Sequence, residues 1–185
     1  SIICPDKGDI ISVPIVLTKY LNKFSIDTTN KKASAECGLW LSKFSRKISH
    51  ECFDGFSGLM GFPATIGGAI FMNAGSYGQE ISDFLESVDC VNEKGVIVNL
   101  KKKELNFAWR SSNFQNIFKQ YFILRAHFNL KKQDKKKIID HQNFCKNHRI
   151  SFQEKGGTNL GSTFATKWIY SDIQTEKITF NISRK

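Results

Sequence analysis

The sequence has few cysteines, and none are paired at a metal-binding or redox spacing. Five cysteines are spread over 185 residues, and no two of them form a C-x-x-C pair. An odd, widely spaced set of this kind excludes a disulfide framework and a zinc knuckle. We therefore expect a reduced, cytoplasmic protein that binds no metal.

A hydrophobic run able to cross a membrane is also lacking, and no signal peptide is visible. The longest stretch without charge, from Gly55 to Gln79, has 25 residues, which is long enough to span a bilayer. Seven glycines, a proline and an asparagine interrupt this stretch. We therefore expect no contact with a membrane.

Acidic side chains are scarce in the second half of the chain. The first 100 residues carry nine basic and eleven acidic side chains, whereas the last 85 carry eighteen and six. This asymmetry favours anion binding by the second half. The competing interpretation is that lysines have accumulated on solvated surface, since the chain has 22 Lys and 5 Arg. The lysine clusters lack interleaved aromatic residues, so we expect no nucleic-acid partner.

Composition and periodicity predict a folded protein of the α+β class. With 41% hydrophobic and 24% charged residues, the chain can bury a core as one domain, or as one domain and part of another. Strand-like and helix-like segments follow one another irregularly, which argues against a doubly wound sheet. The patterns predict an edge strand at 10–17, a helix at 39–50, a hairpin over 87–100, a strand at 121–130 and a surface helix at 131–148.

In two of these segments, particular residues recur at the spacing of a strand or of a helix. In the strand at 121–130, alternation predicts one buried face, formed by Phe122, Leu124, Ala126, Phe128 and Leu130. In the helix at 131–148, helical intervals separate Ile138, Ile139, Gln142 and Cys145. The first set indicates a strand with one buried face, and the second indicates a surface helix.

Glycines gather in a single segment. Seven of the 13 glycines lie between Gly55 and Gly78. Glycine lets backbone amides approach a ligand closely, as they do in phosphate sites. The segment contains neither of the two common nucleotide fingerprints, G-x-G-x-x-G and G-x-x-x-x-G-K-[ST]. Composition alone therefore leaves phosphate binding and close backbone packing equally open.

The order of residues in this segment is more specific than its composition. Residues 63–69 read PATIGGA and residues 72–78 read MNAGSYG, which resembles the P-G-T-x-G-G-A and M-N-A-G-A-Y-G signature of the UDP-N-acetylenolpyruvoylglucosamine reductase (MurB) family of flavoenzymes. Two further blocks follow in the family's order: FAWRSSNF at 107–114 is similar to F-x-Y-R-x-S-x-F, and NLGSTF at 159–164 to A-G-S-x-F. The resemblance covers nearly all of residues 8–170.

The resemblance implies a fold and a domain division. It predicts an α+β protein with an FAD-binding domain of the vanillyl-alcohol-oxidase type at residues 1–148. The start of a smaller α+β substrate-binding domain is expected at residues 149–185. The family's N-terminal lobe and its C-terminal catalytic glutamate have no counterpart among these 185 residues.

The resemblance also implies a reaction. In this family NADPH reduces FAD, and the flavin then passes hydride to UDP-N-acetylglucosamine enolpyruvate, giving UDP-N-acetylmuramate for peptidoglycan. The chain is thus expected to be a cytoplasmic oxidoreductase of cell-wall biogenesis, hence of cell shape and division, with FAD, NADPH and a UDP-sugar as its ligands. The alternative is a catalytically inactive remnant that binds a nucleotide-like anion.

Individual roles follow only where residues match a family motif. Arg110 matches the arginine that stabilises enolate-like charge, and Ser162 matches the serine that donates a proton. The residues expected to bind the cofactor are Pro63, Thr65, Gly67, Gly68, Asn73, Gly75 and Tyr77. Substrate binding is expected at Lys155 and at Thr166, which stands where the family has asparagine.

Two residues depart from the motifs near the expected cofactor site. Trp109 replaces the family's tyrosine, and Ala64 replaces its glycine. If position 64 required a left-handed backbone, the alanine Cβ would cost about 1 kcal/mol.

Overall fold

A computed structural model describes residues 18–152 of the chain. The strands are β1 (Phe24–Asp27), β2 (Lys32–Glu36), β3 (Gly75–Ser76), β4 (Gln79–Glu80), β5 (Leu85–Val91), β6 (Ile97–Lys101) and β7 (Phe122–Asn129). The α-helices are α1 (Leu41–His50), α2 (Ile66–Phe71) and α3 (Lys135–Phe152). Short 3-10 helices cover Thr18–Tyr20, Ile81–Asp83, Lys102–Glu104 and Asn113–Gln115. The strand expected at 10–17 lies outside the described residues.

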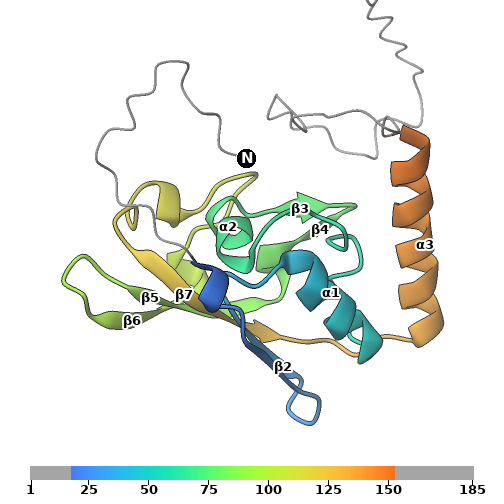
Figure 1. The fold of residues 1–185 in the computed structure, drawn as a ribbon, viewed down its shortest axis with the longest axis horizontal. Helices are drawn as coiled ribbons and strands as arrows, with labels where there is room; N and C mark the ends of the chain where they lie inside the picture. Colours follow the sequence, from blue (N-terminus) through green and yellow to red (C-terminus); the bar gives the residue numbers. More distant parts are fainter. Residues whose placement is uncertain (1–17, 153–185) are drawn as a thin grey trace, which may run out of the picture.

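One antiparallel sheet forms the base of the described fold. Its strand order is β1-β2-β7-β5-β6, and β3 and β4 make a separate two-stranded ribbon. β5 and β6 are the predicted hairpin, and Gly95 in their connection has the positive φ expected of such a turn. β7 is the last described strand in sequence order but lies between β2 and β5 in the sheet. Antiparallel pairing with helices grouped on one face confirms the α+β class (Figure 1).

Burial along β7 differs from strict alternation. Ala126 and Phe128 are buried as predicted, but nearer the start of the strand Ile123 is buried and Leu124 is only half-buried. The register against β5 shifts at this point, and the Leu124 carbonyl accepts a hydrogen bond from the Cys37 N–H at 2.8 Å. A β-bulge reverses which residues face the core on one side of it, so the prediction for Leu124 was wrong.

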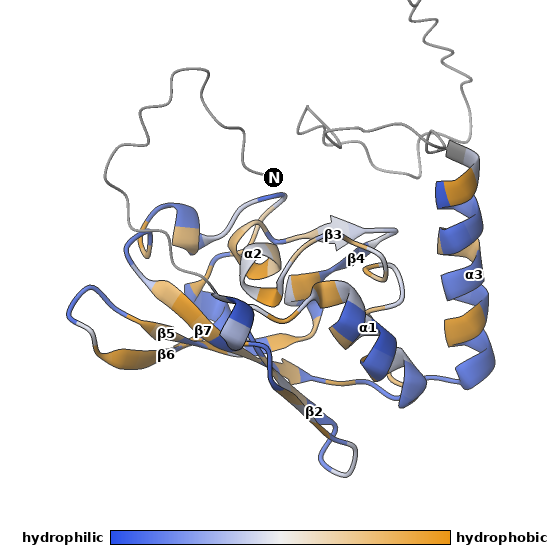
Figure 2. Ribbon diagram, viewed as in Figure 1, coloured by the Kyte–Doolittle hydropathy of each residue, from blue (hydrophilic) through white to orange (hydrophobic). Residues whose placement is uncertain are grey.

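Helix α1 covers one face of the sheet. Phe44 and Ile48 are fully buried on its inner side, which confirms the amphipathic helix predicted at 39–50. The Phe44 ring centre lies 5.2 Å from that of Phe128 in β7 and 5.3 Å from that of Phe56 in the glycine-rich segment. An aromatic cluster thus joins sheet, helix and glycine-rich segment, and orange segments face one another across this layer in Figure 2.

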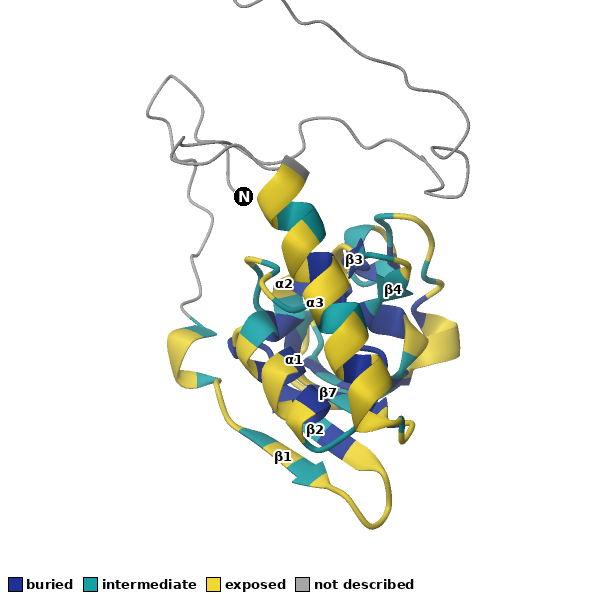
Figure 3. Ribbon diagram, turned by 90° about the vertical axis from the view of Figure 1, so that its right-hand side faces the viewer, coloured by how far each residue is buried: buried dark blue, intermediate teal, exposed yellow. Residues whose placement is uncertain are grey.

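Helix α3 stands at one end of the two layers (Figure 1). Ile138 and Cys145 are buried, whereas Ile139 is 42% exposed, and most of the helix surface is exposed in Figure 3. The predicted surface helix is therefore confirmed, although it begins at Lys135 rather than at 131. Within residues 18–152, no helix has the length and apolar character of a membrane span. The expected domain boundary after residue 148 falls inside α3 and stays a prediction.

The opposite face of the sheet carries polar pairs. Lys32 bridges to Glu86 at 2.6 Å, and His127 lies 2.7 Å from Asp89 on the neighbouring strand. The PATIGGA and MNAGSYG motifs lie on the other side, where α2 and the β3-β4 ribbon pack (Figure 1).

Candidate functional site

Helix α2 begins within the PATIGGA motif, and hydrogen bonds hold its first turn in place. Thr65 precedes the helix, and its Oγ1 accepts a hydrogen bond from the Gly68 N–H at 3.3 Å. The Gly67 N–H donates to the Cys37 carbonyl at 2.8 Å, and the Ile66 N–H donates to the Leu39 carbonyl at 2.9 Å. These bonds hold a six-residue helix that contains two adjacent glycines, a composition unfavourable to an isolated helix.

The two glycines of this helix have different roles. A Cβ at Gly67 would lie 2.9 Å from the Cys37 Cβ, so only glycine permits the close packing of α2 there. A Cβ at Gly68 would meet only the Thr65 Oγ1, at 3.5 Å, and Gly68 is exposed. Helix α2 is therefore packed against Cys37 at Gly67, and its outer face is open at Gly68.

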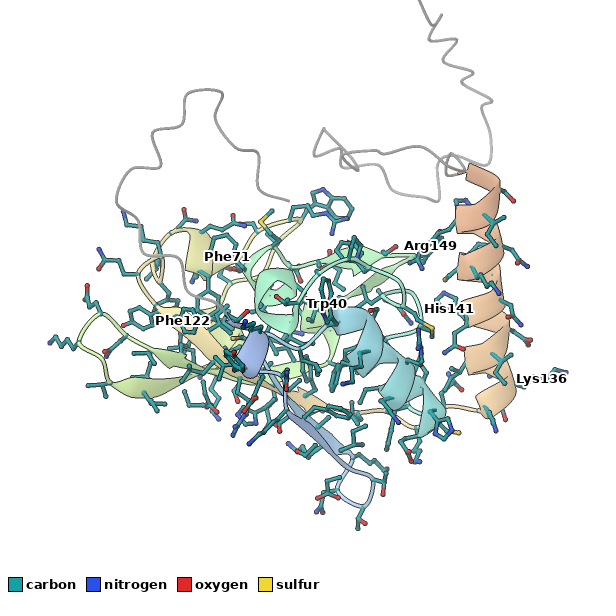
Figure 4. The ribbon with its side chains drawn as sticks, viewed as in Figure 1. Trp40, Phe71, Phe122, Lys136, His141 and Arg149 are labelled. Carbon is teal, nitrogen blue, oxygen red and sulfur yellow. The ribbon has the colours of Figure 1, made fainter. Side chains whose placement is uncertain are left out.

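Large apolar side chains are exposed near both ends of α2. Phe71 and Met72, at its C-terminal end, are 40% and 43% exposed, and Trp40, whose backbone bridges to Thr65, is 58% exposed. Phe71 and Trp40 are labelled near α2 in Figure 4. Pro63 is exposed as well, and Ala64 is not among the residues with positive φ. Alanine at position 64 therefore carries no left-handed strain.

The FAWRSSNF motif forms a tight turn beside the end of α2. Ala108 and Ser111 exchange two backbone hydrogen bonds of 3.1 Å, which places Trp109 and Arg110 at the tip of the turn. Arg110 has a φ of 54°, a left-handed conformation that is uncommon for a side chain of this size. The Ser112 hydroxyl donates to the Phe71 carbonyl at 2.8 Å and joins the turn to α2.

The Arg110 side chain contacts the MNAGSYG motif. Its Nη2 donates to the Gly75 carbonyl at 2.9 Å, and its guanidinium carbon lies 4.8 Å from the centre of the Trp109 ring. Among the described residues this is the one hydrogen bond that the guanidinium makes, so four of its five N–H donors form none with this part of the chain. The two motifs predicted to act together are therefore in direct contact.

Asn73 connects the same two motifs from inside the fold. It is 1% exposed, with a φ of 43°, and its Nδ2 donates to the Glu80 carboxylate at 2.8 Å and to the Ala108 carbonyl at 3.0 Å. Both partners are acceptors, which sets the orientation of the amide. Its buried Oδ1 has no partner among the described residues. Asn73 lies beneath the surface rather than on it.

Gly75 and Tyr77 occupy the β3-β4 ribbon. A Cβ at Gly75 would lie 2.9 Å from the Glu80 Cγ, so this glycine is required by packing. Tyr77 has a φ of 53°, its hydroxyl is 3.2 Å from His148 Nδ1, and the Arg149 guanidinium lies 4.9 Å from its ring centre. The structure thus brings Tyr77 against α3, beside a shallow hollow lined by Tyr77, Gly78, Phe144 and His148.

Helix α3 also binds the first part of the glycine-rich segment. Arg149 donates to the Gly58 carbonyl at 2.8 Å and to the Met60 carbonyl, and His141 Nδ1 lies 2.6 Å from the Ser57 hydroxyl. In Figure 4 the labelled Arg149 and His141 point from α3 toward the body of the molecule, whereas Lys136 points away. Close packing is therefore the role of this part of the segment. His141 and Arg149 were not identified from the sequence, although their spacing with Cys145 marks one helix face.

Two of the free cysteines are buried in the core of the described fold. Cys37 and Cys90 are buried, and burial raises their thiol pKa to about 11 and about 12, so both are protonated at neutral pH. Within residues 18–152, no group of three or more His, Cys, Asp or Glu is placed to hold a metal ion. Ser162, Lys155 and Thr166 lie outside the described residues.

Known proteins resemble this chain over most of its length. A family model described as "FAD binding domain" matches residues 5–101, slightly more than half of the chain. UDP-N-acetylenolpyruvoylglucosamine reductase of Borrelia garinii subsp. bavariensis is 35% identical over 164 residues, which are 89% of this chain and 52% of the relative. The reductase of Clostridium beijerinckii is 38% identical over 157 residues, 85% of this chain and 50% of the relative. The chain therefore spans about half the length of the curated relatives it matches.

A solved structure agrees with these relatives. The crystal structure of UDP-N-acetylenolpyruvylglucosamine reductase (MurB) from Thermus caldophilus superposes with a TM-score of 0.60 and 25% identity, over 70% of this chain and 46% of that one. Family model, relatives and solved structure agree with the family that the motifs predicted. The chain thus belongs to the FAD binding domain family, as a relative of the UDP-N-acetylenolpyruvoylglucosamine (MurB) reductases.

Proposed function

We propose that this chain carries the FAD site of a cytoplasmic reductase that uses NADPH to convert UDP-N-acetylglucosamine enolpyruvate to UDP-N-acetylmuramate. The observation that carries the proposal is the hydrogen bond of 2.9 Å from Arg110 to the Gly75 carbonyl. This bond joins the two motifs that a flavoenzyme of this kind must bring together, the cofactor segment and the charge-stabilising arginine. The similarity to curated reductases supports the same function.

The residues around α2 fit the cofactor. Gly68 leaves the outer face of the helix open, the Thr65 hydroxyl lies beside it, and exposed Phe71 and Met72 offer apolar contact to a ring system. The charge-free segment suits a dinucleotide held by backbone and hydroxyl dipoles. The proposed cofactor-binding residues are Pro63, Thr65, Gly67, Gly68, Asn73, Gly75 and Tyr77. Bound FAD would supply the hydride chemistry, with NADPH as the reductant.

Arg110 is the proposed stabiliser of negative charge on the substrate. A guanidinium held in place by one bond keeps further donors for a carboxylate whose charge grows in the transition state. Ser162 is the proposed proton donor; a serine hydroxyl acts in this role by placement, because its acidity is low. Lys155 and Thr166 are the proposed contacts to the UDP-sugar.

A flavin titration of the purified chain tests the cofactor site. We expect the visible spectrum to show about one FAD per chain, as one dinucleotide site requires. Gly68→Ala should weaken FAD binding about tenfold, because its methyl group would occupy the open face of α2 at a cost of about 1.4 kcal/mol. The unfolding midpoint of this variant should not fall, since its Cβ meets only Thr65 Oγ1, at 3.5 Å.

Gly67→Ala is the matched comparison for this experiment. Its Cβ would clash with Cys37, so we expect a loss of about 1–3 kcal/mol in the free energy of unfolding. A colourless chain that takes up no added FAD would contradict the proposed function. Equal FAD affinity in Gly68→Ala and the parent chain would exclude the outer face of α2 as the site.

A further inference from the structure

Gln115 lies one residue after the FAWRSSNF motif. It contacts both that motif and the C-terminal end of α2. Its Nε2 is 3.1 Å from the Phe71 carbonyl at the end of α2 and 3.2 Å from the Met72 sulfur. The same nitrogen is 3.2 Å from the carbonyl of Arg110. The Gln115 carboxamide therefore connects the end of α2 to the turn that carries Arg110.

The turn that carries Arg110 needs such external support. A left-handed backbone costs a residue with a Cβ about 1–2 kcal/mol, so the turn persists only where its neighbours hold it. Asn73 holds the Ala108 carbonyl at the start of the turn. Among the described residues, Gln115 provides the one side-chain hydrogen bond to the backbone of Arg110 itself.

We propose that Gln115 is a positioning residue for the reductase reaction, which acts by holding the backbone of Arg110. Rotation of the Arg110 peptide would swing its side chain away from Gly75, to which its Nη2 donates. Displacement of a charge-stabilising group by about 1 Å can cost about a hundredfold in rate. This inference rests on the role proposed above for Arg110.

Trp109 allows a test that is independent of cofactor and activity. The chain has three tryptophans, so Trp40→Phe with Trp168→Phe leaves Trp109 as the only one, next to Arg110 at the tip of the turn. In this background Gln115→Met should raise acrylamide quenching of Trp109 about twofold and lower its fluorescence anisotropy, because the turn becomes more mobile. Gln120→Met, an exposed residue nearby, is the control and should change neither. Unchanged Trp109 signals in Gln115→Met would overturn the proposal.

Kinetics of the FAD-loaded full chain give the second readout. We expect Gln115→Met to keep FAD affinity within about twofold and to lower kcat/KM for UDP-N-acetylglucosamine enolpyruvate by about tenfold to a hundredfold. In an Arg110→Ala background the same substitution should have no further effect, since a positioning residue acts through its partner. Additive losses would overturn the positioning role. If the chain takes up no FAD, the proposed function fails, and the Trp109 measurement still decides whether Gln115 holds the turn.

Discussion

At the scale of single residues, Glu36 shows how backbone contacts determine the ionisation of a side chain. It is buried at the end of β2; the Lys23 N–H donates to its Oε2 at 2.8 Å, and Arg125 Nη2 donates to its Oε1 at 3.1 Å. The bond from Lys23 is the main cause that lowers the pKa of Glu36 below its ordinary value of 4.5. Burial opposes this shift, and Arg125 adds to it.

The lowered pKa predicts acid-sensitive stability. A carboxyl whose folded pKa is below its unfolded pKa stabilises the fold above the unfolded value, and this contribution is lost as pH falls through the folded pKa. Glu36→Gln should therefore lower the free energy of unfolding by about 1 kcal/mol at pH 7 and flatten its decline between about pH 5 and 3. Urea denaturation at several pH values measures the free energy of unfolding and its decline with falling pH. Glu86→Gln, in the exposed pair with Lys32, should cost less than about 0.5 kcal/mol; an equal cost would contradict the prediction.

At the scale of elements, α3 is held to the fold by polar contacts more than by apolar burial. Ile138 and Cys145 are its buried apolar side chains. Arg149 donates to two carbonyls of the glycine-rich segment and stacks on Tyr77. An element attached in this way should open separately from the sheet.

Arg149→Met tests this attachment. It removes the two hydrogen bonds and the stacking on Tyr77, so hydrogen exchange along α3 should accelerate by an amount that corresponds to about 2 kcal/mol of local stability. Exchange in β5 and β7 should not change. Lys146→Met, at an exposed position on the same helix, is the control and should leave α3 protected. Similar acceleration in both variants would show that Arg149 does not anchor the helix.

At the scale of the whole molecule, the aromatic cluster of Phe44, Phe56 and Phe128 unites the layers. All three are fully buried, with ring centres 5.2 to 5.5 Å apart. They come from α1, the glycine-rich segment and β7, three segments distant in sequence. The fold on which the α2 site rests therefore depends on one shared core.

Phe128→Ala should destabilise the whole described fold. Loss of a fully buried phenylalanine costs about 3–5 kcal/mol, so the urea midpoint should fall sharply while unfolding stays a single transition. Phe144→Ala, where the side chain is 58% exposed on α3, should cost less than about 1 kcal/mol. A small effect of Phe128→Ala, or two separate transitions, would show that the layers do not share a core.

Some helices and strands of this fold were predictable from the sequence, and others were not. The helix at 41–50, the hairpin of β5 and β6 and the strand β7 were predicted because their hydrophobic periodicity is strong. Helix α2 was not predicted, because IGGAIF has low helix propensity and forms through the Thr65 cap and its packing on Cys37. Strand β2, KASAE, was also missed, since its central pairing is with β7, whose residues are far away in sequence.

Sequence by itself determined the family and the α+β class, and it predicted a site at Arg110 and the glycine-rich segment, because motif order and local periodicity are properties of the chain. Tertiary structure decided which glycines pack and which leave a face open, as at Gly67 and Gly68. It also decided that Asn73 and Gln115 contact the backbone of the turn that carries Arg110, and that Arg149 on α3 contacts the glycine-rich segment. Several of these contacts join residues tens of positions apart, such as Asn73 with Ala108, Gln115 with Phe71 and Arg149 with Gly58. Such contacts exist only when the folded backbone brings the segments together.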